Sequence, residues 1–303
     1  MEASSFAATN ATILAQTPPR HHSPYGYVPT LWICALFIAL FGLSTLIHFG
    51  QAIYFRMWWL FPTAVLAGFT EIIGWSGRLW SSKNPLLLDP YLMQITTTII
   101  APTPLVAANF IILGRIIQRL GSEYSRLGPK TYTVVFLCFD FVALVVQAVG
   151  GASASRAAEQ NMNPAKGGHI MLGGIVFQMV AISVYVACAG EFFMRFLAHR
   201  PVRKVQHESS ETELKGQSDT QPVLDRKLQL MIIGLILSTT LIFIRSVYRT
   251  IELADGWTGR IIQTQVYFNV LDGGMITAAM FCLNFFHPGV LLNMSKRHTS
   301  HVA

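Results

Sequence analysis

The chain has 303 residues, of which 52% are hydrophobic and 12% are charged, and its formal net charge is +7. Soluble domains typically carry about 25% charged residues, so this composition predicts an integral membrane protein. The basic residues lie between apolar runs instead of forming one block. They therefore indicate membrane topology and not nucleic-acid binding.

Seven apolar runs follow one another along the chain, each close to the roughly 20 residues that a helix needs to cross a bilayer. They predict an all-α polytopic membrane protein with seven transmembrane helices, at about residues 31–52, 58–80, 91–118, 131–152, 169–196, 228–251 and 264–286. The third run contains Pro102 and Pro104, which remove backbone donors. We therefore expect a kink within the membrane there.

The basic residues are divided unequally between the two sides of this bundle. One side carries 13 of them: Arg56, Arg119, Arg126, Lys130, Arg195, Arg200, Arg203, Lys204, Lys215, Arg226, Lys227, Lys296 and Arg297. The other side carries 5: Arg20, Lys83, Arg156, Lys166 and Arg260. The positive-inside rule then places the N-terminus outside and the C-terminus in the cytosol. Asn10, in Asn10-Ala11-Thr12, is a glycosylation acceptor in the outside tail.

This topology divides the chain into three parts. Residues 1–28 form an extracellular N-terminal tail, residues 29–290 the seven-helix transmembrane domain, and residues 291–303 a cytoplasmic C-terminal tail. The longest loop, at about residues 197–227, is polar and cytoplasmic. The sequence has no phosphate-binding glycine loop and no Cys or His cluster with metal-ligand spacing, so we expect no cofactor and no metal.

Ionisable residues lie inside several of the apolar runs. A charge at the bilayer centre costs about 2.5–3.5 kcal/mol on insertion scales, so such residues usually face the bundle interior and pair there. The candidate substrate-binding or coupling residues are Glu71, Asp140, Gln147 and Asp272. The candidate charge partners are Arg78, Arg245, Arg249 and Glu252. A structural network that fixes helix register is the alternative for any single residue, but the whole set favours function.

The sequence spacing of these residues indicates which of them share a helix face. Glu71 and Arg78 are seven residues apart, so they share a helix face and lie about 10 Å apart along its axis. This is too far for a direct pair, and we expect each to have a partner on another helix. Asp140 and Gln147 have the same spacing on the fourth helix.

Short motifs follow one another in a fixed order along residues 27–290. They are Tyr27-x-Pro29, Phe41-Gly42-Leu43-Ser44-Thr45, Glu71-x-x-Gly74-x-x-Gly77-Arg78, Ala101-Pro102, Gly114-Arg115, Asp140 with Gln147, Gly150-Gly151, Gly168-x-Ile170-Met171, Gln178, Arg245-x-x-Tyr248-Arg249-x-x-Glu252, Asp272 and His287-Pro288-Gly289. The series resembles a fungal membrane family, the lipid-translocating exporters, named also for resistance to aminocholesterol. One departure concerns the start of the seventh helix, where Gln265 and Asn269 stand in place of an expected acid followed by an aromatic residue.

The resemblance implies a protein that is not an enzyme and that exports or flips amphiphilic lipids or toxic amphiphiles, conferring resistance to them. Sphingoid long-chain bases and sterol amines are the compounds associated with the family. Glu71 and Asp140 would hold the cationic head group or a proton, while the tail stays between helices or among the membrane lipids. The family and the outside acceptor site predict the plasma membrane, with the vacuole and the endoplasmic reticulum as alternatives.

A seven-helix receptor or lipid sensor, signalling through the long cytoplasmic loop, is the main alternative. Against it, no loop contains a cysteine for the usual extracellular disulfide. An intramembrane enzyme is disfavoured, because His48, His169 and His287 lie at different span ends without metal-binding spacing and no G-x-S-x-G motif occurs. The ligand, the transport direction, the energy coupling and the oligomeric state stay open at this point.

Overall fold

The computed structural model describes residues 23–160, 162–202, 225–257 and 259–292. Within these ranges every regular element is helical, which confirms the all-α prediction. The longer helices are α2 (Leu31–Tyr54), α3 (Leu66–Lys83), α4 (Leu88–Ile100), α5 (Pro102–Leu120), α6 (Pro129–Glu159), α7 (Ala165–Leu197), α8 (Arg226–Asp255) and α10 (Met275–Phe285). The short elements are η1 (Trp58–Leu60), η2 (Phe61–Val65), η3 (Ser122–Tyr124), α9 (Gln265–Tyr267), η4 (Phe268–Gly274) and α11 (Pro288–Leu292).

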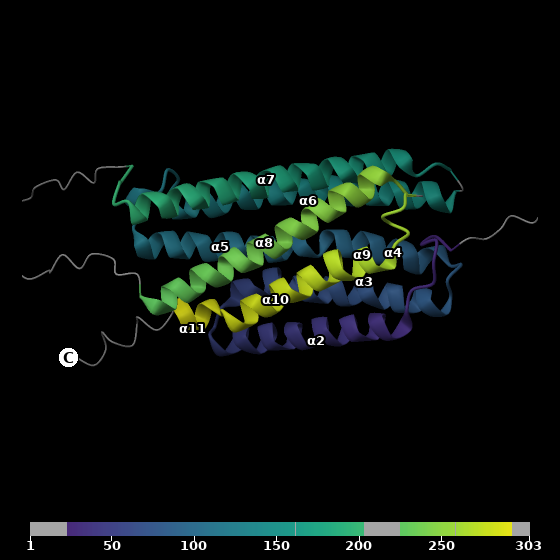
Figure 1. The fold of residues 1–303 in the computed structure, drawn as a ribbon, viewed down its shortest axis with the longest axis horizontal. Helices are drawn as coiled ribbons and strands as arrows, with labels where there is room; N and C mark the ends of the chain where they lie inside the picture. Colours follow the sequence, from purple (N-terminus) through teal and green to yellow (C-terminus); the bar gives the residue numbers. More distant parts are fainter. Residues whose placement is uncertain (1–22, 161, 203–224, 258, 293–303) are drawn as a thin grey trace, which may run out of the picture.

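The long helices lie side by side along the long axis of the molecule, and the connecting segments lie at its two ends (Figure 1). Helices α6 and α7 pack against each other along their length, whereas α8 crosses the bundle obliquely (Figure 1). The segment that precedes α2 and the C-terminal helix α11 lie at opposite ends of the bundle (Figure 1).

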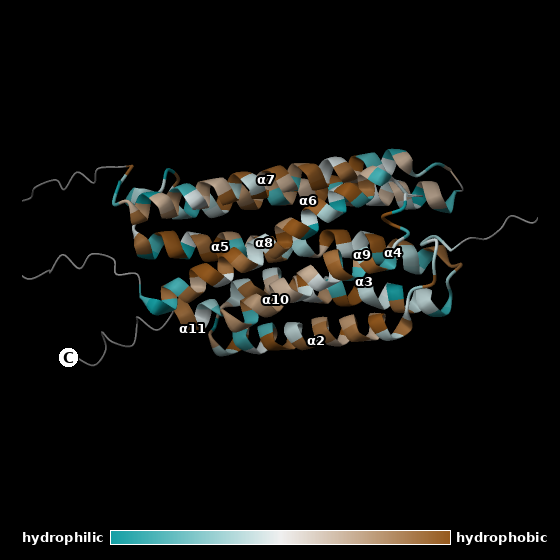
Figure 2. Ribbon diagram, in the orientation of Figure 1, coloured by the Kyte–Doolittle hydropathy of each residue, from teal (hydrophilic) through white to brown (hydrophobic). Residues whose placement is uncertain are grey.

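Six segments of the described chain are long and apolar enough to cross a membrane: α2, α4 with α5, α6, α7, α8, and the run from α9 to α11. Figure 2 shows apolar residues along the middle of the helices and hydrophilic residues gathered toward both ends of the bundle. The second predicted span, residues 58–80, corresponds to η1, η2 and α3 and is not among the six. Helix α3 carries Glu71, Arg78 and Lys83, which lower its mean hydropathy. A seventh crossing therefore stays a prediction.

The kink expected in the third run is present as a break between two helices. Helix α4 ends at Ile100 and α5 begins at Pro102. Because Pro102 has no N–H, the backbone oxygen of Thr98, four residues earlier, receives no helical hydrogen bond from it. This oxygen is left available to a donor from another helix.

Glycines allow two helix pairs to approach closely. A Cβ on Gly150 of α6 would lie 2.4 Å from the backbone nitrogen of Met171 in α7. A Cβ on Gly77 of α3 would lie 2.8 Å from the backbone oxygen of Pro90 in α4. No side chain fits at these distances, so the glycines set the spacing of helices that carry buried acids.

Helix α6 is longer than the sequence predicted, because it continues past residue 152 to Glu159. The added residues include three alanines, which favour a helix, and the next break is at Asn163-Pro164. Three predicted features lie wholly or mostly outside the described residues: the Asn10 acceptor, the long loop at about 197–227 and the C-terminal tail at 291–303. They stay predictions.

Candidate functional site

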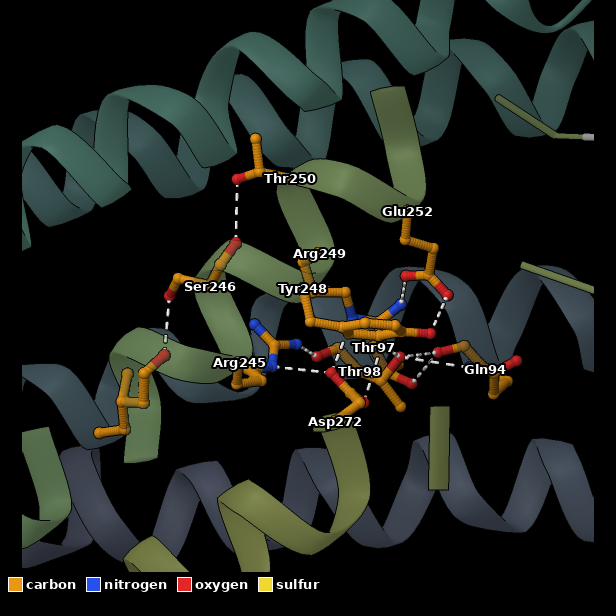
Figure 3. A network of polar contacts seen from close by, with 11 residues as sticks. Gln94, Thr97, Thr98, Arg245, Ser246, Tyr248, Arg249, Thr250, Glu252 and Asp272 are labelled. Atoms are coloured by element: carbon orange, nitrogen blue, oxygen red, sulfur yellow. Dashed lines mark hydrogen bonds and ion pairs between the residues drawn. The ribbon is translucent and has the colours of Figure 1, made fainter. Parts of the chain in front are cut away.

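Two arginines of α8 and one aspartate of η4 form the centre of a buried ionic network (Figure 3). The Arg249 Nε donates to Asp272 Oδ1 at 2.7 Å, and its Nη2 donates to Oδ2 at 2.9 Å. The Arg245 Nε donates to the same Oδ1 at 2.8 Å. The three side chains are 0%, 1% and 5% exposed for Arg249, Asp272 and Arg245 respectively. One carboxylate therefore bridges two buried guanidinium groups.

Glu252 and Tyr248 extend this network along α8. Glu252 Oε2 accepts a hydrogen bond of 2.7 Å from Arg249 Nη1, and its Oε1 accepts one of 2.8 Å from the Tyr248 hydroxyl. Two arginines thus face two carboxylates, and their formal charges cancel. The free-energy cost of burying ions is smallest when their charges cancel and their donors and acceptors are hydrogen-bonded.

Thr98 connects the network to α4. Its hydroxyl accepts a hydrogen bond of 2.7 Å from Arg249 Nη2, and its backbone oxygen accepts one from Arg245 Nη2. This is the oxygen that Pro102 leaves without a helical donor. Gln94, one turn earlier, donates to the Thr98 hydroxyl at 3.3 Å. The break before α5 therefore creates an acceptor for a buried arginine.

The local sequence explains why these groups meet. Arg245, Arg249 and Glu252 recur every three to four residues, so all three face the bundle interior from one side of α8. Asp272 lies in η4, a π-helical turn of the kind that is frequent at functional sites. Four of the predicted residues, the three on α8 and Asp272, are thus brought together.

Glu71 is buried near this network but is not part of it. The residue is 1% exposed, and the only neighbouring donor to its carboxylate in the described chain is the Trp75 indole N–H, one turn along α3, which does not form a well-aligned hydrogen bond. The charges of Asp272, Arg245 and Arg249 act on it from a distance, and no basic side chain of the described residues forms an ion pair with it. The partner that we expected for Glu71 on another helix is therefore not found in the described chain.

Arg78 is enclosed by aromatic rings instead of acids. Its Nη2 donates to the Tyr27 hydroxyl at 2.6 Å. Its guanidinium carbon lies 4.3 Å from the ring centre of Phe268, 5.3 Å from that of Tyr25 and 5.6 Å from that of Trp75. Such cation–π contacts are stabilising when the cation is desolvated. The partners of Arg78 are thus Phe268 of η4 and two tyrosines, Tyr25 and Tyr27, in the segment that precedes α2.

That segment, residues 23–30, closes one end of the bundle over Arg78. The Tyr25 hydroxyl donates to Ser81 Oγ of α3 at 3.2 Å. Burial raises the pKa of Tyr25 to about 12, although the charge of Arg78 opposes the rise, so the phenol keeps its proton and stays a donor. Thr30 Oγ1 donates to Gln265 Oε1 of α9 at 3.2 Å.

Asp140 lies in a separate polar cluster between α5, α6 and α7. Its Oδ1 accepts a hydrogen bond of 2.6 Å from Gln178 Nε2, which also donates to Thr103 Oγ1 at 3.1 Å. Gln147 Nε2 donates to Gln178 Oε1 at 2.9 Å. Asp140 is 2% exposed, and no basic side chain of the described residues pairs with it. The predicted residues Asp140 and Gln147 are therefore joined through Gln178.

Sequence reasoning missed Thr98 and Tyr25, and it named Tyr27 and Gln178 as motif residues without giving either a role at these sites. Thr98 could have been found from its position four residues before Pro102, which marks a free backbone oxygen. Tyr25 and Tyr27 lie outside the apolar runs, and nothing in the spacing places them over Arg78. In the described part of the chain, no group of three or more His, Cys, Asp or Glu is arranged to hold a metal ion.

Charged networks buried between long apolar helices define the chain as a multi-pass integral membrane protein. The family model described as "RTA1 like protein" matches residues 64–295. The chain belongs to this RTA1-like family.

Curated relatives come from Saccharomyces cerevisiae. The protein named sphingoid long-chain base transporter RSB1 is 29% identical over 303 residues, which cover 93% of this chain and 79% of that protein. Protein RTA1 is 26% identical, over 90% of this chain and 87% of its own length. Protein RTM1 is 24% identical, over 75% of this chain and 67% of its own length. No solved structure matches the chain.

Proposed function

We propose that the protein translocates or exports amphiphilic lipids or toxic amphiphiles with a cationic head group, such as a sphingoid long-chain base or a sterol amine, and so confers resistance to them. It acts as a seven-helix bundle in the plasma membrane, with its N-terminus outside. The opposite positions of the segment before α2 and of α11 are consistent with an odd number of crossings (Figure 1), and the excess of basic residues on one side supports the orientation. The relative named as a sphingoid long-chain base transporter supports the substrate class.

The proposal depends on one observation: two buried carboxyl groups, Glu71 and Asp140, have no basic partner in the described chain. Burying an ionised carboxylate alone is costly, so each group needs a proton or a cation. A primary ammonium group brings one positive charge and three donors, which match the acceptor oxygens of a carboxylate. The apolar tail of the same molecule stays among helices and lipids.

Asp272 and Glu252 have a different role in this proposal. Both already accept hydrogen bonds from Arg249, so neither has an unpaired charge to offer a substrate. We infer that they hold α8 against η4 and so support the site. Gln147 acts in a similar way, because it holds the amide of Gln178 that donates to Asp140.

Release of a labelled sphingoid base from sealed proteoliposomes, with and without a proton gradient, tests the proposal. The wild-type protein should accelerate release, and the effect of the gradient establishes whether transport is proton-coupled. Glu71→Gln and Asp140→Asn remove a negative charge at nearly constant volume. Each should lower the release rate about tenfold, as expected when a favourable charge interaction of roughly 1.4 kcal/mol is lost.

Two exposed acids provide matched controls. Glu159→Gln at the end of α6 and Asp89→Asn at the start of α4 make the same chemical changes at exposed positions, and both should leave release unchanged. If both buried variants fold and release the base at the wild-type rate, the head-group role is wrong. If the folded wild-type protein releases no base but its long loop binds a G protein in a nucleotide-dependent way, the receptor alternative replaces transport.

A further inference from the structure

An apolar groove opens between α7 and α8 on the outer surface of the bundle. Its volume is about 400 Å³, within the range of roughly 300–1,000 Å³ that is usual for small-molecule sites. Its walls include Val186, Gly190 and Phe193 from α7, and Ile236 and Phe243 from α8. Val186 and Ile236 are 46% and 54% exposed, so the groove faces the surroundings that lipid would occupy.

The course of α8 accounts for the groove. Toward the C-terminal end of α8 the two helices touch, where the Thr250 hydroxyl of α8 lies 3.8 Å from Met179 Sδ in the middle of α7. From there α8 crosses the bundle obliquely and separates from α7 (Figure 1). Ala189 and Gly190 are small, so α7 does not fill the space that the divergence leaves.

Tyr185 and Thr239 form the floor of the groove and also line a second, smaller cavity behind it. This inner cavity measures about 10 Å³ and is bounded by Asn109 and Ile182 among others. The Tyr185 hydroxyl donates to the backbone oxygen of Asn109 at 3.2 Å, which holds the ring in place. Tyr185 and Thr239 thus separate the groove from this inner cavity.

Asp140 does not line either space, but it lies close to the inner cavity along α6 and α7. Gln178, which donates to Asp140, lies one helical turn from Ile182 of the inner cavity, or about 6 Å along α7. On α6, Phe136 precedes Asp140 by one turn, and its ring centre lies 5.5 Å from that of Tyr185. The groove floor and the Asp140 carboxyl group are therefore separated by about one helical turn along both α6 and α7.

We propose that the α7–α8 groove binds the single alkyl chain of a cationic amphiphile whose head group reaches Asp140, with Tyr185 and Thr239 as the gate between them. This inference rests on the proposed function. The apolar walls suit a hydrocarbon chain, and the carboxyl group beyond the gate suits a positive head. A phospholipid would instead bring an anionic phosphate toward Asp140, which charge repulsion opposes. The Tyr185 ring must rotate for the head group to pass.

Photolabelling of the wild-type protein in proteoliposomes tests the groove directly. The probe is a sphingoid base with a diazirine in the middle of its alkyl chain, and labelled peptides are mapped by mass spectrometry. Labelling should concentrate on residues 183–193 of α7 and 235–243 of α8, and unlabelled sphingoid base should compete for it. Labelling spread evenly over all lipid-facing helices, without competition, would overturn the proposal.

A pair of glycines on α7 offers a matched test by substitution. A Cβ on Gly190 or on Gly173 would meet nothing within 4 Å, so both positions have room for a larger side chain. Gly190 lines the groove, whereas Gly173 is exposed elsewhere on the helix. Gly190→Trp should lower both labelling and release of the base about tenfold, and Gly173→Trp should lower neither.

The two measurements separate this inference from the proposed function. Equal release by the two folded tryptophan variants, with wild-type transport intact, would reject the groove and leave transport standing. Competed labelling of the groove without any transport by the wild-type protein would support the alkyl-chain site and reject the proposed function. If Gly190→Trp does not fold, the competed labelling pattern of the wild-type protein decides the question alone.

Discussion

Arg249 and Asp272 form a bidentate ion pair that joins α8 to η4 in the interior of the bundle, with contacts of 2.7 and 2.9 Å. The planar guanidinium group matches the carboxylate with two parallel hydrogen bonds, a geometry that lysine cannot reproduce. Because Arg249 also binds Thr98 of α4, the pair connects three parts of the chain that are distant in sequence.

Removing Arg249 should destabilise the protein strongly. Breaking one partner of a buried pair typically costs about 3–5 kcal/mol, because the remaining charge is left uncompensated. Arg249→Ala should therefore lower the thermal unfolding temperature of the detergent-purified protein by many degrees, and Arg249→Lys by less. Arg260→Ala, at an exposed position, is the control and should have little effect. An unfolding temperature for Arg249→Ala equal to that of the control would contradict this account.

Much of this network could be predicted from the sequence. Arg245, Arg249 and Glu252 are spaced to share one helix face, and charges in an apolar run must turn inward and find partners. Asp272 is the only acid in the last apolar run, but the sequence placed it with Glu71 and Asp140 among the substrate-binding candidates and did not select it as the partner of these arginines. Helix periodicity and the cost of burying charge predict that the charges turn inward, and only the tertiary contacts show which of them pair.

Other features could not be predicted, because they depend on tertiary contacts. The spacing of Glu71 and Arg78 correctly excludes a direct pair, but it cannot show that one lacks any partner and the other is surrounded by rings. The position of Tyr27 over Arg78 depends on how the segment before α2 folds back. The groove beside Gly190 depends on the crossing angle of α8, which no periodicity specifies.

Close packing of α6 on α7 should make Gly150 intolerant of even a methyl group. A Cβ there would lie 2.4 Å from the backbone nitrogen of Met171, and backbone cannot move aside as a flexible side chain can. Gly150→Ala should therefore destabilise the protein by about 1–3 kcal/mol, as overpacking does. Gly173→Ala on α7, where no atom lies within 4 Å, should be neutral or slightly stabilising in the same thermal unfolding measurement.

The hydroxyl of Tyr27 should hold residues 23–30 over the end of the bundle. Tyr27→Phe keeps the ring near Arg78 but removes a hydrogen bond to a charged group, a type of contact that contributes about 1.5–3 kcal/mol. Hydrogen–deuterium exchange of residues 23–30 should become faster, while exchange in α6 and α7 should not change. Tyr54→Phe, at an 81% exposed position, is the matched control. Unchanged exchange in the Tyr27 variant would show that the aromatic contacts alone hold the segment.

The predicted orientation can be tested through two glycosylation acceptors outside the described residues, Asn10 in the N-terminal tail and Asn293, which begins Asn293-Met294-Ser295, in the C-terminal tail. The proposed topology places them on opposite sides of the membrane. Only an acceptor on the outer side passes through the compartment where glycans are attached. The full-length protein expressed in a fungal host should therefore lose an endoglycosidase-sensitive mass shift on Asn10→Gln and keep it on Asn293→Gln. Loss of the shift in the Asn293 variant alone would reverse the topology.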